Sequence, residues 1–183
     1  AIDMACTALA NTLVFSGRPG EVDQVAERLT TGNELVDVAM YFPRTIAAML
    51  QGRLDEALGL ARVGLERRLA VGREVPLAHA ALSELALGLV LVERGEFAEA
   101  DEVLAAAYQD VVSQHIPQLH TWLAAGRGRS ALVSGRLDDA RDRFVEARSV
   151  AEQARFGTGG RLALAGVAGA EEVLLVAVAQ PGR

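Results

Sequence analysis

Apolar residues recur along this chain every three or four positions, which is the spacing of one face of an α-helix. The rhythm is clearest in Leu58, Ala61, Leu65 and Leu69. Read between turn signals, such segments predict nine helices over residues 2–16, 20–31, 34–51, 54–72, 76–93, 97–114, 117–134, 137–156 and 160–179. Proline is tolerated at a helix start, where Pro76 and Pro117 stand, but Pro43 falls inside the third segment. We therefore expect a kink or a break at Pro43.

Four short segments that share one motif lie between these helices. They are GRPGEVDQV from Gly17, GRLDEALGL from Gly52, GEFAEADEV from Gly95 and GRLDDARDR from Gly135, spaced by 35, 43 and 40 residues. The glycine can close one helix in the left-handed conformation, and the acids that follow meet the positive end of the next helix dipole. The small residue after the acid, alanine in three of the four copies, lets two helices approach closely. The motif predicts helical hairpins that bury their apolar faces by stacking.

A second set of mostly small residues stands seven positions before these glycines, at Ala10, Thr45, Gly88 and Gly128. A glycine inside a helix costs about 1 kcal/mol relative to alanine. We therefore expect Gly88 and Gly128 where a partner helix packs closely, while Thr45 fits this role less well.

Composition supports an all-α protein. The chain is 51% hydrophobic and 23% charged but only 4% aromatic, and alanine and leucine are strong helix formers. We predict an all-α superhelical solenoid of about four and a half antiparallel hairpins in a single domain over residues 1–183. The expected hairpins cover residues 1–32, 34–72, 76–114 and 117–156, followed by a last helix over 160–179.

The net charge of −6 makes a nucleic-acid surface unfavourable, because binding to phosphates requires clustered cations. No apolar run reaches the roughly 18 residues of a membrane span, and the nearest candidate, 162–179, is interrupted by Glu171 and Glu172. The lone Cys6 cannot form an internal disulfide, which is compatible with a reducing cytoplasm. The first residues do not resemble a signal peptide, and both ends indicate a segment of a longer protein.

The pattern Gly-x-[Leu/Phe]-x-[Glu/Asp]-Ala, with a glycine seven positions earlier, resembles the tetratricopeptide repeat over essentially the whole chain. The repeats are longer than the usual 34 residues and lack that family's aromatic residue near the start of the first helix and its terminal proline. Lengthened, alanine-rich repeats and the stretch 161–183 resemble the sensor region of large LuxR-type (MalT-like) bacterial transcriptional regulators. This resemblance implies a cytoplasmic, non-catalytic module that binds a ligand or a protein, with an ATPase before it and a DNA-binding helix-turn-helix after it. The alternative is a tetratricopeptide adaptor that holds two proteins together.

Candidate catalytic patterns are weak. His115 and His120 are five residues apart with a proline between them, which is unsuitable for two metal ligands on one helical face. The glycine-rich stretch 156–161 lacks the lysine of a phosphate-binding loop, and the acid pairs Asp138–Asp139 and Glu171–Glu172 point about 100° apart on a helix. We expect no enzymatic activity, no cofactor and no metal site.

The remaining candidate site is a groove lined by the first helix of each hairpin. Its proposed members are Asn11, Phe15, Phe42, Met49, Leu85, Leu89, Trp122 and Arg129. This mostly apolar set is either buried core or an open groove for an apolar or amphipathic ligand, a partner helix or a second copy of the chain. Trp122 and Arg129, seven residues apart on one helical face, are its most specific expected contacts.

Overall fold

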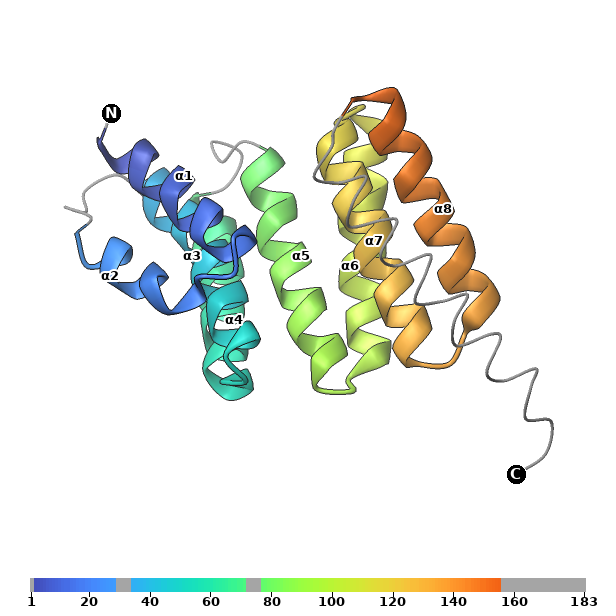
Figure 1. The fold of residues 1–183 in the computed structure, drawn as a ribbon, viewed down its shortest axis with the longest axis horizontal. Coiled ribbons are helices and arrows are strands. Elements are labelled where there is room, and N and C mark those ends of the chain that lie inside the picture. The colour runs from blue at the N-terminus through green and yellow to red at the C-terminus, as the bar shows by residue number, and fades with distance from the viewer. Residues whose placement is uncertain (1, 29–33, 72–76, 156–183) are drawn as a thin grey trace. The chain divides into compact units, whose positions relative to one another are not determined.

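The computed structural model describes residues 2–28, 34–71 and 77–155, and all regular structure in these ranges is helical (Figure 1). The elements are α1 (Ile2–Phe15), a 3-10 helix η1 (Pro19–Glu21), α2 (Val22–Ala26), α3 (Glu34–Leu50), α4 (Leu54–Val71), α5 (Leu77–Glu93), α6 (Phe97–Ser113), α7 (Pro117–Val133) and α8 (Leu137–Gln153). The all-α prediction is confirmed for this part of the chain. The helix expected over 160–179 lies outside it. None of the helices described is long and apolar enough to cross a membrane.

Two of the predicted helices differ from expectation. The segment expected as one helix over 20–31 is the short η1 followed by the five-residue α2, because Pro19 and Gly20 favour a tight turn at its start. Of the kink or break expected at Pro43, the break does not occur, since α3 runs through this residue to Leu50. Pro43 is almost fully buried, and α3 packs against α1, α4 and α5. Packing of this kind offsets the loss of one backbone hydrogen bond.

The glycines of the repeated motif end helices as predicted. Gly17, Gly52, Gly95 and Gly135 have φ between 74° and 81°, in the left-handed region. At Gly52 the backbone N–H donates to the carbonyl of Met49 (3.0 Å), and the N–H of Arg53 donates to that of Ala48 (2.9 Å). Equivalent pairs of hydrogen bonds follow α1 and α7, which makes each a Schellman motif.

Two further helix ends have a left-handed residue that is not glycine: His115 after α6 and Arg155 after α8, the latter with a φ of 54°. His115, after α6, has a φ of 56°, and the N–H of Ile116 donates to the carbonyl of Val111. A side chain at a left-handed position costs of the order of 1 kcal/mol, so these ends carry strain that the glycine ends avoid.

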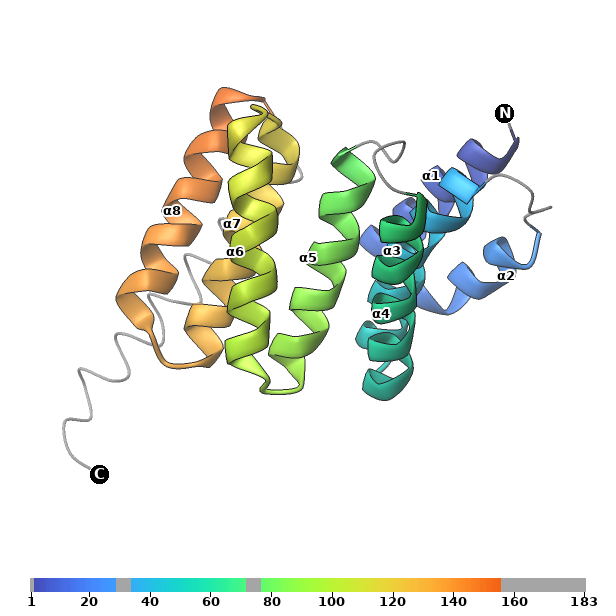
Figure 2. The ribbon, with the colours of Figure 1, turned by 180° about the vertical axis from the view of Figure 1, so that it is seen from behind.

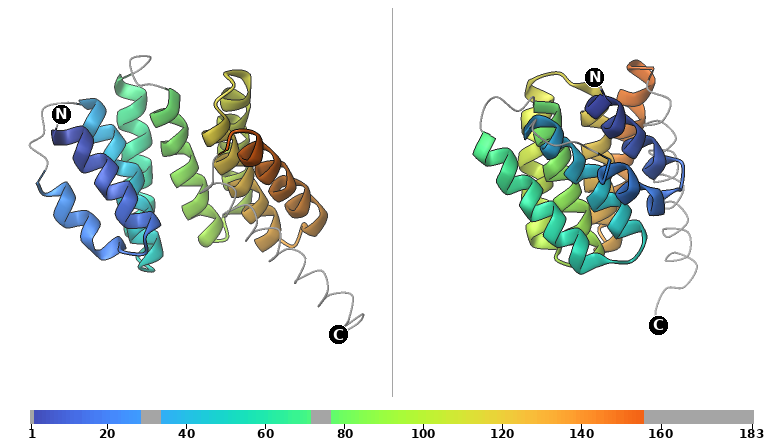
Figure 3. Two further views of the ribbon diagram at one scale, coloured as in Figure 1. Left: turned by 45° about the horizontal axis from the view of Figure 1, so that its top comes forward. Right: turned by 90° about the vertical axis from the view of Figure 1, so that its left-hand side faces the viewer.

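The chain forms two compact units, residues 1–94 and residues 95–183. In the first unit, α1 packs on α3, and α3 packs on α4 and α5; Figure 3 shows this arrangement from two further sides. In the second unit, α7 packs on both α6 and α8 (Figure 2). The hairpin expected over 76–114 is divided between the units, with α5 in the first and α6 in the second.

Small residues mark the closest helix contacts. Ala57, Ala100 and Ala140, the alanines of the repeated motif, are completely buried. A Cβ added to Gly128 would lie 2.9 Å from Cε1 of Phe144, which confirms close packing at this glycine. A second close contact, at Gly64, has no counterpart in the sequence motif, because its Cβ would lie 2.6 Å from Cβ of Tyr41.

Candidate functional site

The groove residues of the first unit divide between core and surface. Phe42 and Leu85 are core residues, each only 4% exposed. Met49 is half-buried against a cluster of Ala48, Ala57 and Val90, and Leu89 and Asn11 are also half-buried. Phe15 is 51% exposed. For Phe42 and Leu85 the structure therefore favours the core alternative over an open groove.

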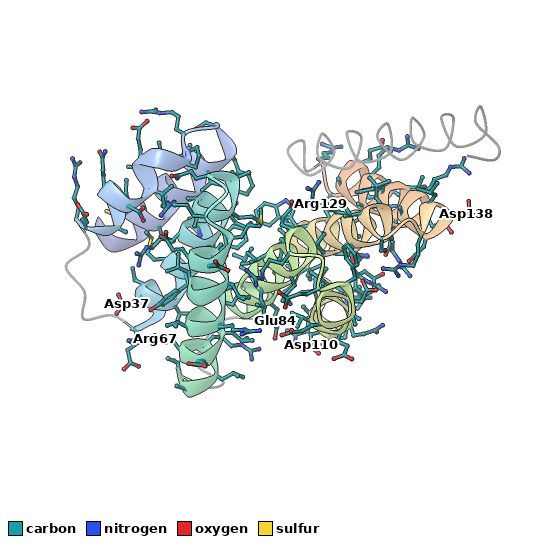
Figure 4. All side chains as sticks on the ribbon, turned by 90° about the horizontal axis from the view of Figure 1, so that it is seen from below. Asp37, Arg67, Glu84, Asp110, Arg129 and Asp138 are labelled. Carbon is teal, nitrogen blue, oxygen red and sulfur yellow. The ribbon has the colours of Figure 1, made fainter. Side chains whose placement is uncertain are left out.

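In the second unit, Trp122 is half-buried on α7. Arg129 is exposed on the same helix (Figure 4). Gln118 and Val133 are exposed on the same face, since 118, 122, 129 and 133 differ by multiples of roughly one helical turn. We call these four residues the α7 strip. It combines one indole ring, one guanidinium group and one aliphatic side chain, which is suitable for contact with an amphipathic surface.

The other faces of α7 take part in a continuous set of polar contacts, which we call the polar chain. It runs across α6, α7 and α8 through Ser130, Asp101, Arg136, Asp139, Arg143, Glu146, His120 and Tyr108. At one end, the buried hydroxyl of Ser130 donates to Oδ1 of Asp101 (2.6 Å), and Arg136 donates to Oδ2 of the same carboxylate (2.7 Å).

At the other end, three side chains from three helices meet. The phenol of Tyr108 (α6) donates to Oε1 of Glu146 (α8), and Nε2 of His120 (α7) lies 2.7 Å from the same oxygen. The Tyr108 and His120 rings meet edge to face, with centroids 5.3 Å apart. The Arg127 guanidinium lies 4.7 Å from the Tyr108 ring centroid, a cation–π contact. Because the polar groups of Tyr108, His120 and Glu146 are hydrogen-bond partners of one another, they join α6, α7 and α8. We call these three side chains the clasp.

The same contacts shift two pKa values. Burial acts to raise the pKa of Glu146, but hydrogen bonds from Tyr108, His120 and Arg143 outweigh it and leave the pKa below its usual value. Burial, followed by the hydrogen bond to Glu146, raises the pKa of Tyr108. Both shifts favour the protonation states that maintain the clasp, an ionised carboxylate and a neutral phenol.

Ion pairs also connect three of the four motif turns to an acid that follows the preceding motif glycine. In the first unit, Arg53 lies 3.6 Å from Asp23, and Arg94 donates to Asp55. In the second unit, Arg136 pairs with Asp101. Each pair joins residues near two successive motif glycines, although they are 30 to 39 positions apart in sequence. Exposed ion pairs of this kind contribute about 0–1 kcal/mol each to the free energy of unfolding. Their main effect is therefore on how neighbouring helices align, and only a small part of the stability comes from them.

Sequence reasoning did not anticipate the polar chain. His120 was weighed only against His115, which is exposed at the end of α6, while its actual partner Glu146 is 26 residues away. No group of three or more His, Cys, Asp or Glu side chains is placed to hold a metal ion within the described ranges.

The chain was also compared with known proteins. Neither protein-family models, nor curated proteins, nor solved structures gave a match.

Proposed function

We propose that this chain is a tetratricopeptide-like solenoid that binds a protein partner or an amphipathic ligand without catalysis. The observation that carries the proposal is the recurrence of one turn, with a left-handed glycine and an acid in the following segment. Three of the four turns also have an ion pair to an acid that follows the preceding motif glycine. In proteins built from such repeats, each unit contacts mainly its neighbours, and the stacked units present extended surfaces for binding.

We further propose that the module regulates a LuxR-type transcription factor in the cytoplasm, through packing changes when its surface is occupied. The motif resemblance supports this assignment. The α7 strip is the preferred contact surface, since an aromatic ring beside an arginine is typical of residues that dominate protein interfaces. The alternative is an adaptor that joins two proteins, for which the repeated turns provide equal support.

The complete gene offers the first test, because a regulator requires a nucleotide-binding domain before the repeats and a helix-turn-helix after them. In that full-length protein, Trp122→Ala and Arg129→Ala should each change the transcription of a target reporter at unchanged protein level. Arg141→Ala, which removes an exposed arginine from α8, is the matched control. Absence of both flanking domains would leave the adaptor, and a reporter insensitive to both strip variants would remove the α7 strip as the regulatory surface.

A further inference from the structure

Arg127 on α7 differs from the other half-buried arginines of the described residues. Each of the other five has a carboxylate oxygen at most 3.8 Å from its guanidinium group. These five are Arg44, Arg53, Arg68, Arg143 and Arg148. Arg127 has no carboxylate at such a distance in the ranges that the structure describes, and its guanidinium lies instead 4.7 Å from the centroid of the Tyr108 ring. A cation that is partly removed from water is usually paired, so this exception requires an explanation.

The acidic side chains nearby are engaged with other groups. Glu146, Asp101 and Asp139 each have a cationic or hydrogen-bonding side chain at both carboxylate oxygens. No Asp or Glu occurs on α7 itself. The residues one helical turn away from Arg127 are Leu123, Ala124, Ser130 and Ala131. The described part of the chain therefore offers Arg127 no counter-ion at short range.

The Tyr108 ring holds the Arg127 guanidinium while leaving its donors available. The ring is itself fixed, because its hydroxyl donates to Glu146 and its plane is nearly perpendicular to that of His120. A cation–π contact uses no hydrogen-bond donor. Among the described residues, the buried side-chain nitrogens that lack an acceptor include Nε of Arg143 but no nitrogen of Arg127. The donors of Arg127 are therefore accessible to solvent.

A second guanidinium lies close to the same ring. Arg143 is 5.9 Å from the Tyr108 centroid and is already paired with Glu146. It adds positive potential beside Arg127, while the uncommitted donors are those of Arg127. An anion that approaches this point along α7 meets no carboxylate on that helix.

We propose that Arg127 binds an oxyanion, a carboxylate or phosphate group that comes from outside the chain. The planar guanidinium presents paired N–H donors whose spacing matches two oxygens of such a group. Because the ring already holds the guanidinium, little conformational freedom is lost on binding. Arg127 is not part of the α7 strip. The inference therefore goes beyond the proposed function and does not depend on it.

NMR titration of the 183-residue chain tests the site directly. The probes are inorganic phosphate, acetate and a tetraglutamate peptide, each at an ionic strength kept constant with chloride. We expect a saturable shift of the Arg127 Nε–Hε resonance, which is assigned by its loss in Arg127→Lys. Arg141, exposed on α8, provides the reference resonance and should show no saturable shift. Saturation by phosphate or acetate identifies a free anion as sufficient, and saturation by the peptide alone identifies an acidic protein segment.

Substitution shows whether Arg127 provides the affinity. Arg127→Met keeps an aliphatic side chain on the Tyr108 ring but removes the donors, so the dissociation constant of the saturating probe should rise at least about tenfold. Arg141→Met is the matched control and should leave it unchanged. Circular dichroism checks that both variants stay folded, and the titration of the unmodified chain does not depend on either.

Three results would each overturn the proposal. The first is that no probe saturates the Arg127 resonance. The second is that the Arg141 resonance shifts as much as that of Arg127, which indicates general screening by salt. The third is that folded Arg127→Met binds the probe as tightly as the unmodified chain.

Discussion

The ring of Phe144 on α8 lies directly against the backbone of Gly128 on α7, so that a Cβ at residue 128 would meet three ring carbons at 2.9 to 3.1 Å. Both residues are buried, and Phe144 belongs to a core cluster with Ala124, Ala125, Ala131, Ala140 and Ala147. The contact explains why a helix interior keeps a residue that weakens helices.

Gly128→Ala should therefore lower the free energy of unfolding by about 1–2 kcal/mol, because overpacking outweighs the gain in helix propensity. Urea unfolding monitored by circular dichroism measures this change. In a double-mutant cycle, Phe144→Leu should relieve much of the cost, because it removes the ring that the new methyl group meets. Additive effects of the two substitutions would contradict the close contact.

The two glycines inside α4 should respond in opposite ways to alanine. Gly59 is exposed, and a Cβ there meets nothing within 4 Å, so Gly59→Ala should raise stability by about 0.5–1 kcal/mol. Gly64→Ala should lower it by about 1–3 kcal/mol, because the new methyl group meets Cβ of Tyr41, which moves only with the backbone. Each substitution is the control for the other, and changes of the same sign would contradict the placement of α3 on α4.

Replacing the strained residue after α6 should stabilise the protein. His115→Gly is expected to raise the free energy of unfolding by up to about 1 kcal/mol, because glycine accepts a φ of 56° without steric cost. Gly52→Ala introduces the same strain where it is now absent and should lower stability by about 1 kcal/mol. Chemical denaturation of the two variants beside the unmodified chain gives both values, and a destabilised His115→Gly would show that this side chain has a stabilising contact.

The clasp predicts how stability depends on pH. Because the folded state lowers the pKa of Glu146, its contribution is present above the usual value of 4.5 and is lost as pH falls through the folded pKa. The pKa of Tyr108 is raised, so its contribution is present below 10.0 and is lost as pH rises through the folded pKa.

Glu146→Gln should therefore reduce the loss of stability on the acidic side, and Tyr108→Phe should reduce it on the alkaline side. Midpoints of urea unfolding across the pH range measure both effects. Asp142→Asn, which removes an exposed carboxylate on the same helix, should leave the acidic limb almost unchanged. An acidic limb equally affected by both substitutions would refute the role of the clasp.

The features that the sequence predicted correctly depend on local geometry. Helix ends at Gly17, Gly52, Gly95 and Gly135 follow from the conformations open to glycine. The burial of Ala57, Ala100 and Ala140 follows from their fixed distance to the last three of these ends. The left-handed ends at His115 and Arg155 had no such signal, because residues other than glycine adopt this conformation only in a few per cent of cases.

Features that depend on tertiary packing were harder to predict. Tyr108 and Glu146 are 38 residues apart, and their contact requires the packing of three helices. The groove was equally hard to predict from sequence. Helical position places Phe42 and Phe15 in one group, but Phe42 is buried and Phe15 is exposed. A helical register fixes which residues share a face, whereas burial depends on what covers that face.

The ion pairs between successive turns have a consequence for how such a chain can change length. The segment that begins at Gly52 provides Arg53 for an acid in the preceding element and Asp55 for an arginine at the following turn. The segments are not interchangeable in this pairing, because Glu96 rather than an arginine follows Gly95. Deleting residues 52–94 would therefore put an acid after the motif glycine at the position where Asp23 now meets Arg53. A change of length by one whole segment would alter the charge pairing at the junction, so the order of the segments matters as well as their number.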